Sequence, residues 1–223
     1  LEEKNKDLED FAHIVSHDLK TPLRNILALS YWLKEDLGNN KIKAFNENLT
    51  LLDKQVAQMD LIVEGVLNYS LQNEVTSSHE QVDLDSLIKD IIVLNNNNNS
   101  CAITVKKQMP LVTINKSQIL QIFQNLIQNA IKYNDKEICE IEIDYIQNNE
   151  FYIFSIKDNG IGIDEKHHKK IFKLFQKLEI KKDVDSTGIG LSLVQKIVKR
   201  NKGEIYLESQ VNKGTTFYFT LPI

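Results

Sequence analysis

Apolar residues in the first third of the chain recur in alternating steps of four and three. The first series is Leu8, Ala12, Val15, Leu19, Pro22, Ile26, Leu29 and Leu33, and the second is Ile42, Phe45, Leu49, Leu52, Val56, Met59, Val63 and Val66. This is the heptad spacing of a buried helical seam. Gly38-Asn39-Asn40 separates the series and is typical of a helix end followed by a short turn. Residues 1–72 are therefore predicted to form an antiparallel helical hairpin.

One such hairpin leaves too much of its apolar seam exposed to be stable alone. Two copies packed together close the seam, so we expect a homodimer with a four-helix bundle. Pro22 lies on the seam and removes one backbone donor, which predicts a bend that is either a tolerated kink or a hinge.

The pattern changes after a linker that we place at residues 73–82. Residues 83–223 alternate between helical and strand periodicities, which predicts an α/β sandwich, a mixed sheet with helices over one face. Asn115 or Ser117 is expected to cap the central helix. The expected helices are residues 84–94, 117–133 and 188–200, and the expected strands are residues 102–107, 112–114, 140–146, 151–157, 204–209 and 215–221.

The first candidate site lies on the first predicted helix, in Ser16-His17-Asp18. If the seam residues occupy heptad positions a and d, His17 falls at f and points away from the seam. A large partner can reach an imidazole in that position, although a solvated surface histidine is the plainer interpretation. Thr21 follows one helical turn later on the same face.

The second candidate site is a pair of asparagines on the helix predicted at residues 117–133. Asn125 and Asn129 are four residues apart and share one face, with Lys132 close to that line. Amide oxygens can bind a hard cation such as Mg²⁺, which takes few protein ligands and relies on water and substrate phosphates. The alternative is that both are solvated in a chain rich in asparagine.

Glycine-rich segments supply the third group of candidates. Asp158-Asn159-Gly160-Ile161-Gly162 follows a predicted strand, where a buried carboxylate can accept a hydrogen bond from an exocyclic amine. Residues 187–191 open the last predicted helix and can present free N–H groups to a phosphate. Gly214-Thr215-Thr216 opens the last predicted strand. Taken singly, such segments are also ordinary turns.

Together, these segments resemble those of sensor histidine kinases. Residues 11–23 are similar to the phosphoacceptor box, 125–133 to the N box, 158–163 to the G1 box, 171–175 to the F box, 176–187 to the ATP lid and 187–191 to the G2 box. The resemblance covers nearly the whole chain. It implies the fold that these kinases share with gyrase-type and Hsp90-type ATPases. One departure is Ser186, where the family usually has glycine.

The resemblance also implies roles. His17 accepts the phosphoryl group, Asp18 is its partner, and Thr21 supports dephosphorylation of a receiver. Asn129 binds Mg²⁺ with Asn125 beside it, Lys132 lies near the phosphates, Tyr133 packs against adenine and Asp158 reads adenine. The remaining expected ATP-site residues are Gly160, Gly162, Phe172, Thr187, Gly188, Ile189, Gly190, Leu191, Thr215 and Thr216, with the choice between the two threonines left open.

The implied function is ATP-dependent autophosphorylation on His17 and transfer to an aspartate of a response-regulator receiver domain, with receiver phosphatase activity. Whether autophosphorylation runs within a protomer or across the dimer stays open. One alternative is a degenerate dimeric scaffold or a phosphatase-biased module. Another is an ATPase clamp of the gyrase or Hsp90 type, but those clamps use a glutamate general base where Asn125 stands.

The composition argues against nucleic acid and membrane as binding partners of this chain. The 223 residues carry a formal net charge of −4, which gives no general basic field for nucleic acid. No apolar run reaches the roughly 20 residues that span a bilayer, so we expect no membrane contact in this part and a cytoplasmic location. Cys101 and Cys139 suggest a reducing compartment and no disulfide. We interpret the chain as a fragment of a longer protein, with any sensory and membrane-anchoring parts elsewhere.

Overall fold

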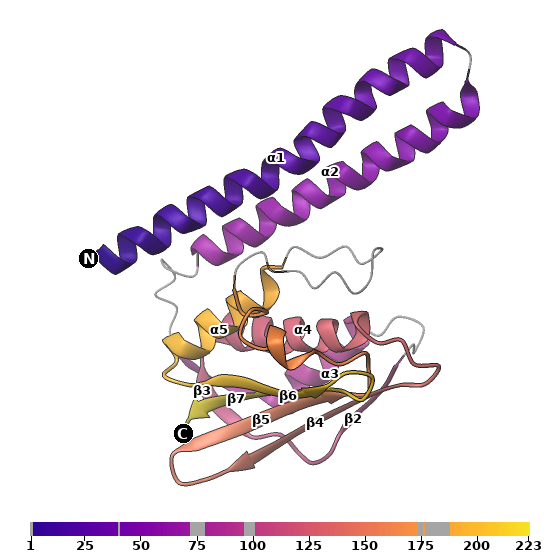
Figure 1. Ribbon diagram of the computed structural model, residues 1–223. Coiled ribbons are helices and arrows are strands. Elements are labelled where there is room, and N and C mark those ends of the chain that lie inside the picture. Colours follow the sequence, from indigo (N-terminus) through magenta and orange to yellow (C-terminus); the bar gives the residue numbers. More distant parts are fainter. Residues whose placement is uncertain (1, 40, 72–78, 96–100, 174–175, 177–187) are drawn as a thin grey trace. The chain divides into compact units, whose positions relative to one another are not determined.

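The computed structural model describes residues 2–39, 41–71, 79–95, 101–173, 176 and 188–223 (Figure 1). It consists of two compact units, a helical hairpin and an α/β domain. This order of a helical hairpin followed by an α/β domain is the one predicted from the hydrophobic pattern.

The hairpin consists of α1 (Glu2–Gly38) and α2 (Ile42–Leu71), which lie side by side in Figure 1. The α1 helix continues through Pro22 as one element. After Gly38, the N–H of Lys41 donates to the carbonyl of Asp36 at 2.9 Å, which holds the turn. The predicted helix end at Gly38 is confirmed.

The described members of the apolar series of α1 are covered in a single chain, whereas those of α2 alternate between covered and exposed positions. On α1, Pro22 and Leu29 are buried. On α2, Phe45, Leu52 and Met59 are half-buried, seven residues apart. The intervening members of the α2 series are exposed within one chain, namely Ile42, Leu49, Val56 and Val63. Half of the seam of α2 is thus covered by α1, and the other half is open.

The α/β domain contains a five-stranded mixed sheet in the order β2-β4-β5-β7-β6. The pair β2–β4 is parallel, and the other neighbours are antiparallel. A separate two-stranded sheet pairs β1 with β3. The strands are β1 (Glu80–Asp83), β2 (Cys101–Val105), β3 (Leu111–Ile114), β4 (Cys139–Gln147), β5 (Phe151–Asp158), β6 (Ile205–Gln210) and β7 (Gly214–Pro222).

Helices cover one face of the five-stranded sheet, as predicted (Figure 1). They are α3 (Leu84–Asn95), α4 (Lys116–Lys132) and α5 (Gly190–Arg200), and a short 3₁₀ helix spans Glu165–His167. Asn115 caps α4, because its side chain accepts from the Gln118 N–H at 3.0 Å. In the core, the Phe123 ring of α4 packs edge-on against Phe154 and Phe219, with centroids 5.7 and 5.4 Å away.

The structure corrects the expectation that the chain contains no disulfide. Cys101 and Cys139 form one, with their Cα atoms 4.6 Å apart and a separation of 38 positions in the sequence. The spacing of the cysteines did not predict the disulfide, because the two residues meet through parallel pairing of β2 with β4, which no local sequence pattern reveals. Strand β1 is a second difference, since it begins at Glu80, inside the stretch assigned to the linker.

Candidate functional site

The phosphoacceptor candidates lie on α1, where the backbone of residues 16–22 is helical throughout. Ser16, Lys20 and Thr21 are exposed, whereas Pro22 is buried. The side chains of His17 and Asp18 lie outside the described atoms. The outward direction of His17 therefore stays a prediction, and the exposure of Lys20 and Thr21 one turn later is consistent with it.

The two asparagines of α4 lie along one side of that helix. Asn125 is half-buried, and its amide nitrogen donates to the carbonyl of Gln121 at 2.8 Å. Asn129 is half-buried as well, and its side-chain amide has no hydrogen-bond partner among the described residues. Ile122, Phe123 and Leu126 are completely buried on the other side. The helix therefore presents amide groups on one side and packs against the sheet on the other.

Asn125 also marks where α4 meets the beginning of α5. A Cβ atom added to Gly190 would lie 2.5 Å from the Asn125 Oδ1 atom, a distance that real Cβ contacts do not reach. Glycine at residue 190 therefore permits the first turn of α5 to approach Asn125. Two segments that are far apart in the sequence, α4 at Asn125 and the start of α5, thus come together.

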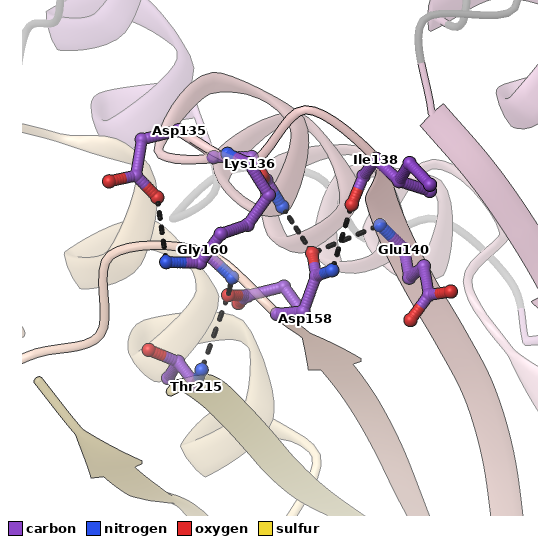
Figure 2. Close-up of polar contacts among 9 residues, drawn as sticks. Asp135, Lys136, Ile138, Glu140, Asp158, Gly160 and Thr215 are labelled. Carbon is purple, nitrogen blue, oxygen red and sulfur yellow. Dashed lines mark hydrogen bonds and ion pairs between the residues drawn. The ribbon is translucent and has the colours of Figure 1, made fainter. Parts of the chain in front are cut away.

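Asp158, the last residue of β5, is buried, with 8% of its surface exposed. Its Oδ1 atom accepts hydrogen bonds from the backbone N–H groups of Gly160, at 2.8 Å, and Thr215, at 3.2 Å (Figure 2). Burial raises the pKa of this carboxyl group, and the two N–H donors partly offset that rise. Both bonds use Oδ1, so Oδ2 has no hydrogen-bond partner among the described residues.

The glycines after Asp158 permit close backbone packing. A Cβ on Gly160 would lie 2.5 Å from the carbonyl oxygen of Tyr133, which ends α4. Gly162 has a φ angle of +68°, and a Cβ there would collide with the backbone of Gln210 at the end of β6. The N–H of Ile161 also donates to the Tyr133 carbonyl at 3.2 Å. These contacts hold the turn at residues 158–162 between the end of α4 and the end of β6. They also place Tyr133 beside Asp158.

Of the two threonines of β7, Thr215 lies at the site. Thr215 is 5% exposed, its N–H bonds Asp158, and its hydroxyl lies 2.8 Å from that of Ser209. Side chains alternate between the two faces of a strand, so Thr216 points to the opposite face of the sheet. Thr215 rather than Thr216 therefore contacts Asp158, and its place beside adenine stays a prediction.

Two residues near Asp158 were given no role from the sequence. The Asn159 side chain accepts from the Asn134 amide at 2.8 Å and from the Glu140 N–H at 3.0 Å, and it donates to the Ile138 carbonyl at 2.9 Å. Ser209 accepts from the Ile163 N–H at 2.7 Å. The position of Asn159 in an Asp-Asn-Gly turn was the available signal, since asparagine side chains often bond nearby backbone groups.

The other predicted site residues are partly described. Phe172 is half-buried and packs edge-on against Phe217, with ring centroids 6.5 Å apart. Gly188 has a φ angle of +69°, Ile189 is buried and Leu191 is half-buried. Lys132 is half-buried in the last turn of α4. Thr187, together with the rest of the predicted lid at residues 177–186, lies outside the described residues.

No group of three or more His, Cys, Asp or Glu side chains arranged to hold a metal occurs in the described part of the chain. A divalent cation at this site would therefore depend on amide oxygens and on the phosphates of a ligand. The unpartnered, half-buried amide of Asn129 fits that chemistry, because Mg²⁺ commonly takes few protein ligands. None of the described helices combines the length and the apolar character needed to cross a membrane.

Two family models match the chain. Residues 7–74 match the His Kinase A (phospho-acceptor) domain, and residues 114–223 match the histidine kinase-, DNA gyrase B- and HSP90-like ATPase. The first match covers most of the helical hairpin, and the second covers most of the α/β domain, including all the predicted nucleotide-site residues.

Curated relatives match over nearly the whole chain. Cyanobacterial phytochrome B of Nostoc sp. (strain PCC 7120) is 39% identical over 226 aligned residues, which span 99% of this chain and 30% of that protein. Methanogenesis regulatory histidine kinase FilI of Methanothrix harundinacea is 30% identical over 229 aligned residues, spanning 100% of this chain and 25% of that protein. The chain thus spans less than a third of the length of either relative.

A solved structure has the same fold. The crystal structure of histidine kinase ThkA in complex with response regulator protein TrrA aligns with a TM-score of 0.72 at 22% identity, covering 99% of this chain and 63% of that one. The two family matches and their order along the chain indicate the same class of protein as the residues around Asp158 do. The chain belongs to the sensor histidine kinases and carries their dimerisation and phosphoacceptor hairpin followed by their ATP-binding domain.

Proposed function

We propose that this chain is the ATP-dependent kinase core of a sensor histidine kinase, which phosphorylates itself on His17 and passes the phosphoryl group to an aspartate of a receiver domain. The observation that carries the proposal is the buried Asp158 carboxylate, whose Oδ1 atom accepts from Gly160 and Thr215 while Oδ2 has no hydrogen-bond partner among the described residues. ATP binding requires a group that recognises the base, for which we propose Asp158, and N–H groups that receive the phosphates, for which we propose the beginning of α5.

Asp158 selects adenine. Its Oδ1 atom is occupied by the N–H groups of Gly160 and Thr215, which hold the carboxylate in one orientation. The Oδ2 atom accepts a hydrogen bond from the exocyclic amine of adenine, whereas guanine presents a carbonyl oxygen at that position and is repelled. Thr215 supports the same contact, and Tyr133 packs against the base.

The phosphates bind at the other end of the site. The N–H groups at the beginning of α5, at Gly190 and Leu191, are available to anionic oxygens, and the helix dipole favours negative charge there. Lys132 supplies a positive charge from the last turn of α4. Asn129, with Asn125 beside it, would hold Mg²⁺, which neutralises phosphate charge when it is bound.

His17 is the nucleophile. A neutral imidazole, with an ordinary pKa of about 6.5, carries a free lone pair at neutral pH. Asp18 accepts from Nδ1–H, which fixes the tautomer and leaves Nε2 to attack the γ-phosphorus. The Nε2–P bond forms as the bond from that phosphorus to the bridging oxygen of ADP breaks, and ADP leaves with the electron pair.

The phosphoryl group then passes to a receiver aspartate. The side of α1 that carries His17 also supports the later removal of that group from the receiver. Thr21 is exposed one turn after His17, where it can position a water molecule against a phosphorylated receiver. Support for a receiver as partner comes from the aligned ThkA structure, which is described as a complex with a response regulator protein.

The hairpin works as half of a homodimeric four-helix bundle. Leu49, Val56 and Val63 form an apolar row on α2 that is 41–50% exposed in a single chain. Their seven-residue spacing is that of a helical seam, and a second copy of the hairpin presents the matching row.

A catalytically degenerate scaffold is the competing function. It is disfavoured because Asp158, Asn129 and Gly190 are all retained in positions suited to the nucleotide. Asn125 also disfavours a hydrolytic ATPase clamp of the gyrase or Hsp90 type, since an amide cannot act as the general base that a glutamate provides.

We assign residues 1–72 to the dimerisation and phosphoacceptor hairpin and 83–223 to the catalytic ATP-binding domain. The linker predicted at residues 73–82 ends before Glu80, because β1 begins there and pairs with β3 of the ATP-binding domain. We also propose that this part of the protein works in the cytoplasm, where ATP and receiver domains are present, without contact with nucleic acid or membrane. The absence of a basic field in a chain of net charge −4 supports the exclusion of nucleic acid.

Incubation with γ-labelled Mg·ATP tests the proposal on the intact chain, on His17→Gln and on Thr21→Ala. We expect acid-labile, alkali-stable label on the intact chain and on Thr21→Ala, and no label on His17→Gln. Thr21→Ala should also dephosphorylate a phosphorylated receiver more slowly than the intact chain does. Thr21→Ala serves as the matched control, because it changes the same helical face without removing the nucleophile.

Label that survives in His17→Gln would move the acceptor to another residue, with His13 the next candidate. A chain that binds Mg·ATP but acquires no label would favour the degenerate or phosphatase-biased module. A chain that does not bind Mg·ATP at all would overturn the enzymatic function.

A further inference from the structure

The disulfide lies at the start of the one parallel strand pair among the described strands. Cys101 is the first residue of β2, Cys139 is the first residue of β4, and the two are register partners. They are the two cysteines of the whole sequence. Their exposed fractions are 5% and 6%, so the cross-link is set into the edge of the core.

One half of the disulfide belongs to an edge strand. β2 pairs with β4 on one side and has no neighbouring strand on its other side among the described residues. Edge strands open locally at a lower free-energy cost than central strands, because fewer hydrogen bonds and contacts hold them. Local opening of β2 would expose the Cys101 sulfur, which makes the bond accessible to exchange although it is buried in the closed state.

The other half is joined to the candidate nucleotide site through its neighbours in sequence. Cys139 lies between Ile138 and Glu140. The Ile138 carbonyl accepts from the Asn159 amide, and the Glu140 N–H donates to the Asn159 oxygen (Figure 2). A further bond, from the Asn159 N–H to the Glu140 carbonyl at 3.3 Å, completes the connection.

Asn159 in turn follows Asp158 directly, so the placement of the adenine-reading carboxylate depends on this connection. The disulfide joins the first residues of β2 and β4, and the backbone on either side of Cys139 bonds Asn159. Asn159 is therefore the one residue that connects the disulfide to Asp158. Fixing Cys139 to β2 restricts the motion of residues 138–140, and with it the motion of the Asn159 side chain.

We propose that Cys101 and Cys139 form a reversible thiol–disulfide modification site whose oxidised form increases the affinity of the site for adenine nucleotide. This rests on the proposed nucleotide binding at Asp158. A site that is already ordered loses less conformational entropy when the ligand binds, so the oxidised form binds more tightly. We expect a difference of about fivefold or more, which is the lower end of typical couplings between sites.

The modification is a thiol–disulfide exchange with a small-molecule disulfide as oxidant. The thiolate of one cysteine attacks a sulfur of the oxidant, which forms a mixed disulfide and releases one thiolate. The second cysteine attacks the protein sulfur of that mixed disulfide and releases the second thiolate. The protein dithiol loses two electrons and two protons, and the oxidant is reduced to two thiols.

The test uses the full chain equilibrated either with dithiothreitol or with glutathione disulfide. Free thiols are counted by alkylation and mass spectrometry, and the Kd of Mg·ATP is measured by calorimetry in each state. The double variant Cys101→Ser/Cys139→Ser is the control, and we expect it to bind with the affinity of the reduced chain under both conditions. In the unmodified chain, glutathione disulfide should protect both cysteines from alkylation and tighten Mg·ATP binding.

Asn159→Asp tests the connection itself. It retains an oxygen that can accept from Asn134 and Glu140 but removes the donor to the Ile138 carbonyl. We expect the disulfide still to form in this variant, while the difference in Kd between the oxidised and reduced states shrinks. Thermal unfolding of each state verifies that the variant is folded.

Three outcomes would overturn the inference alone: both cysteines remain open to alkylation after oxidation, the two redox states bind Mg·ATP equally, or the double serine variant still responds to the oxidant. A chain that forms the disulfide and unfolds at a higher temperature when oxidised, yet binds Mg·ATP in neither state, would overturn the nucleotide site and therefore the coupling. The two failures are distinguishable because alkylation and unfolding need no nucleotide.

Discussion

The helical hairpin and the α/β domain use their apolar residues in different ways. In the α/β domain, Phe123, Phe154 and Phe219 meet in one cluster that a single chain encloses completely. In the hairpin, Leu29 and Ile62 are buried, but Leu49, Val56 and Val63 are left 41–50% exposed. One unit thus completes its core alone, whereas the other has the apolar surface of a core that needs a second copy.

This difference suits the chemistry of each unit. In the proposed function, nucleotide recognition needs a rigid, water-poor site, and Asp158 and Gly190 lie in the unit whose core is closed. A phosphoacceptor must instead be reachable by two large partners, the kinase domain and a receiver. A two-chain bundle supplies a stable helix, and Lys20 and Thr21 near His17 are exposed in the single chain.

Phe123→Ala should have the largest effect, because it removes the ring that contacts both Phe154 and Phe219. We expect the α/β domain to lose about 3–5 kcal/mol of unfolding free energy. Chemical denaturation followed by near-ultraviolet circular dichroism measures this. Leu120→Ala is the control on the same helix, since Leu120 is 37% exposed. Equal losses in the two variants would contradict the closed core.

Leu49→Glu combined with Val56→Glu should separate the dimer. Two charges placed in an apolar seam lose their hydration, so we expect the dissociation constant to rise by about 100-fold or more. Light scattering over a concentration series measures the change. Thr50→Glu with Ala57→Glu is the matched control, because Thr50 and Ala57 are exposed and have the same seven-residue spacing. A dimer that survives the seam variant would place the interface elsewhere.

Asp158 should make nucleotide binding sensitive to acid. Burial raises the pKa of Asp158 above its ordinary 3.8, so the carboxylate becomes protonated at a higher pH than an exposed aspartate does. As the pH falls through that raised pKa, Oδ2 ceases to be an ionised acceptor, and Mg·ATP affinity should fall. Calorimetric titrations over a pH series measure this.

Asp158→Asn supplies the control for that prediction. A folded-state pKa above the unfolded one means that the contribution of Asp158 to stability is present at low pH and is lost as the pH rises through the raised pKa. Near neutral pH, asparagine avoids the cost of a buried charge and can still accept from Gly160 and Thr215. We therefore expect unchanged or higher thermal stability and about tenfold or more weaker Mg·ATP binding. Lower stability with unchanged binding would contradict the assignment.

Local periodicity determined most of the fold. The heptad series predicted both long helices and the turn after Gly38, and the alternating segments predicted the five strands of the main sheet within a few residues. Strand β1 was missed, since Glu80–Asp83 is too short and too polar to give a period-two signal. The site segments were predicted because, taken together and in their order, they resemble the motifs of sensor histidine kinases, whereas each one alone is also typical of an ordinary turn.

What the sequence determined was therefore the elements and their order, which follow from periodicities within short windows, together with motifs whose resemblance to a known family implies a site for a nucleotide and a phosphoryl acceptor. The tertiary structure decided which of these residues meet. It placed the Thr215 N–H against Asp158, brought Gly190 against Asn125, and joined Cys101 to Cys139. Contacts between strands and helices distant in the chain depend on how the sheet is ordered and packed, and no local window contains that information.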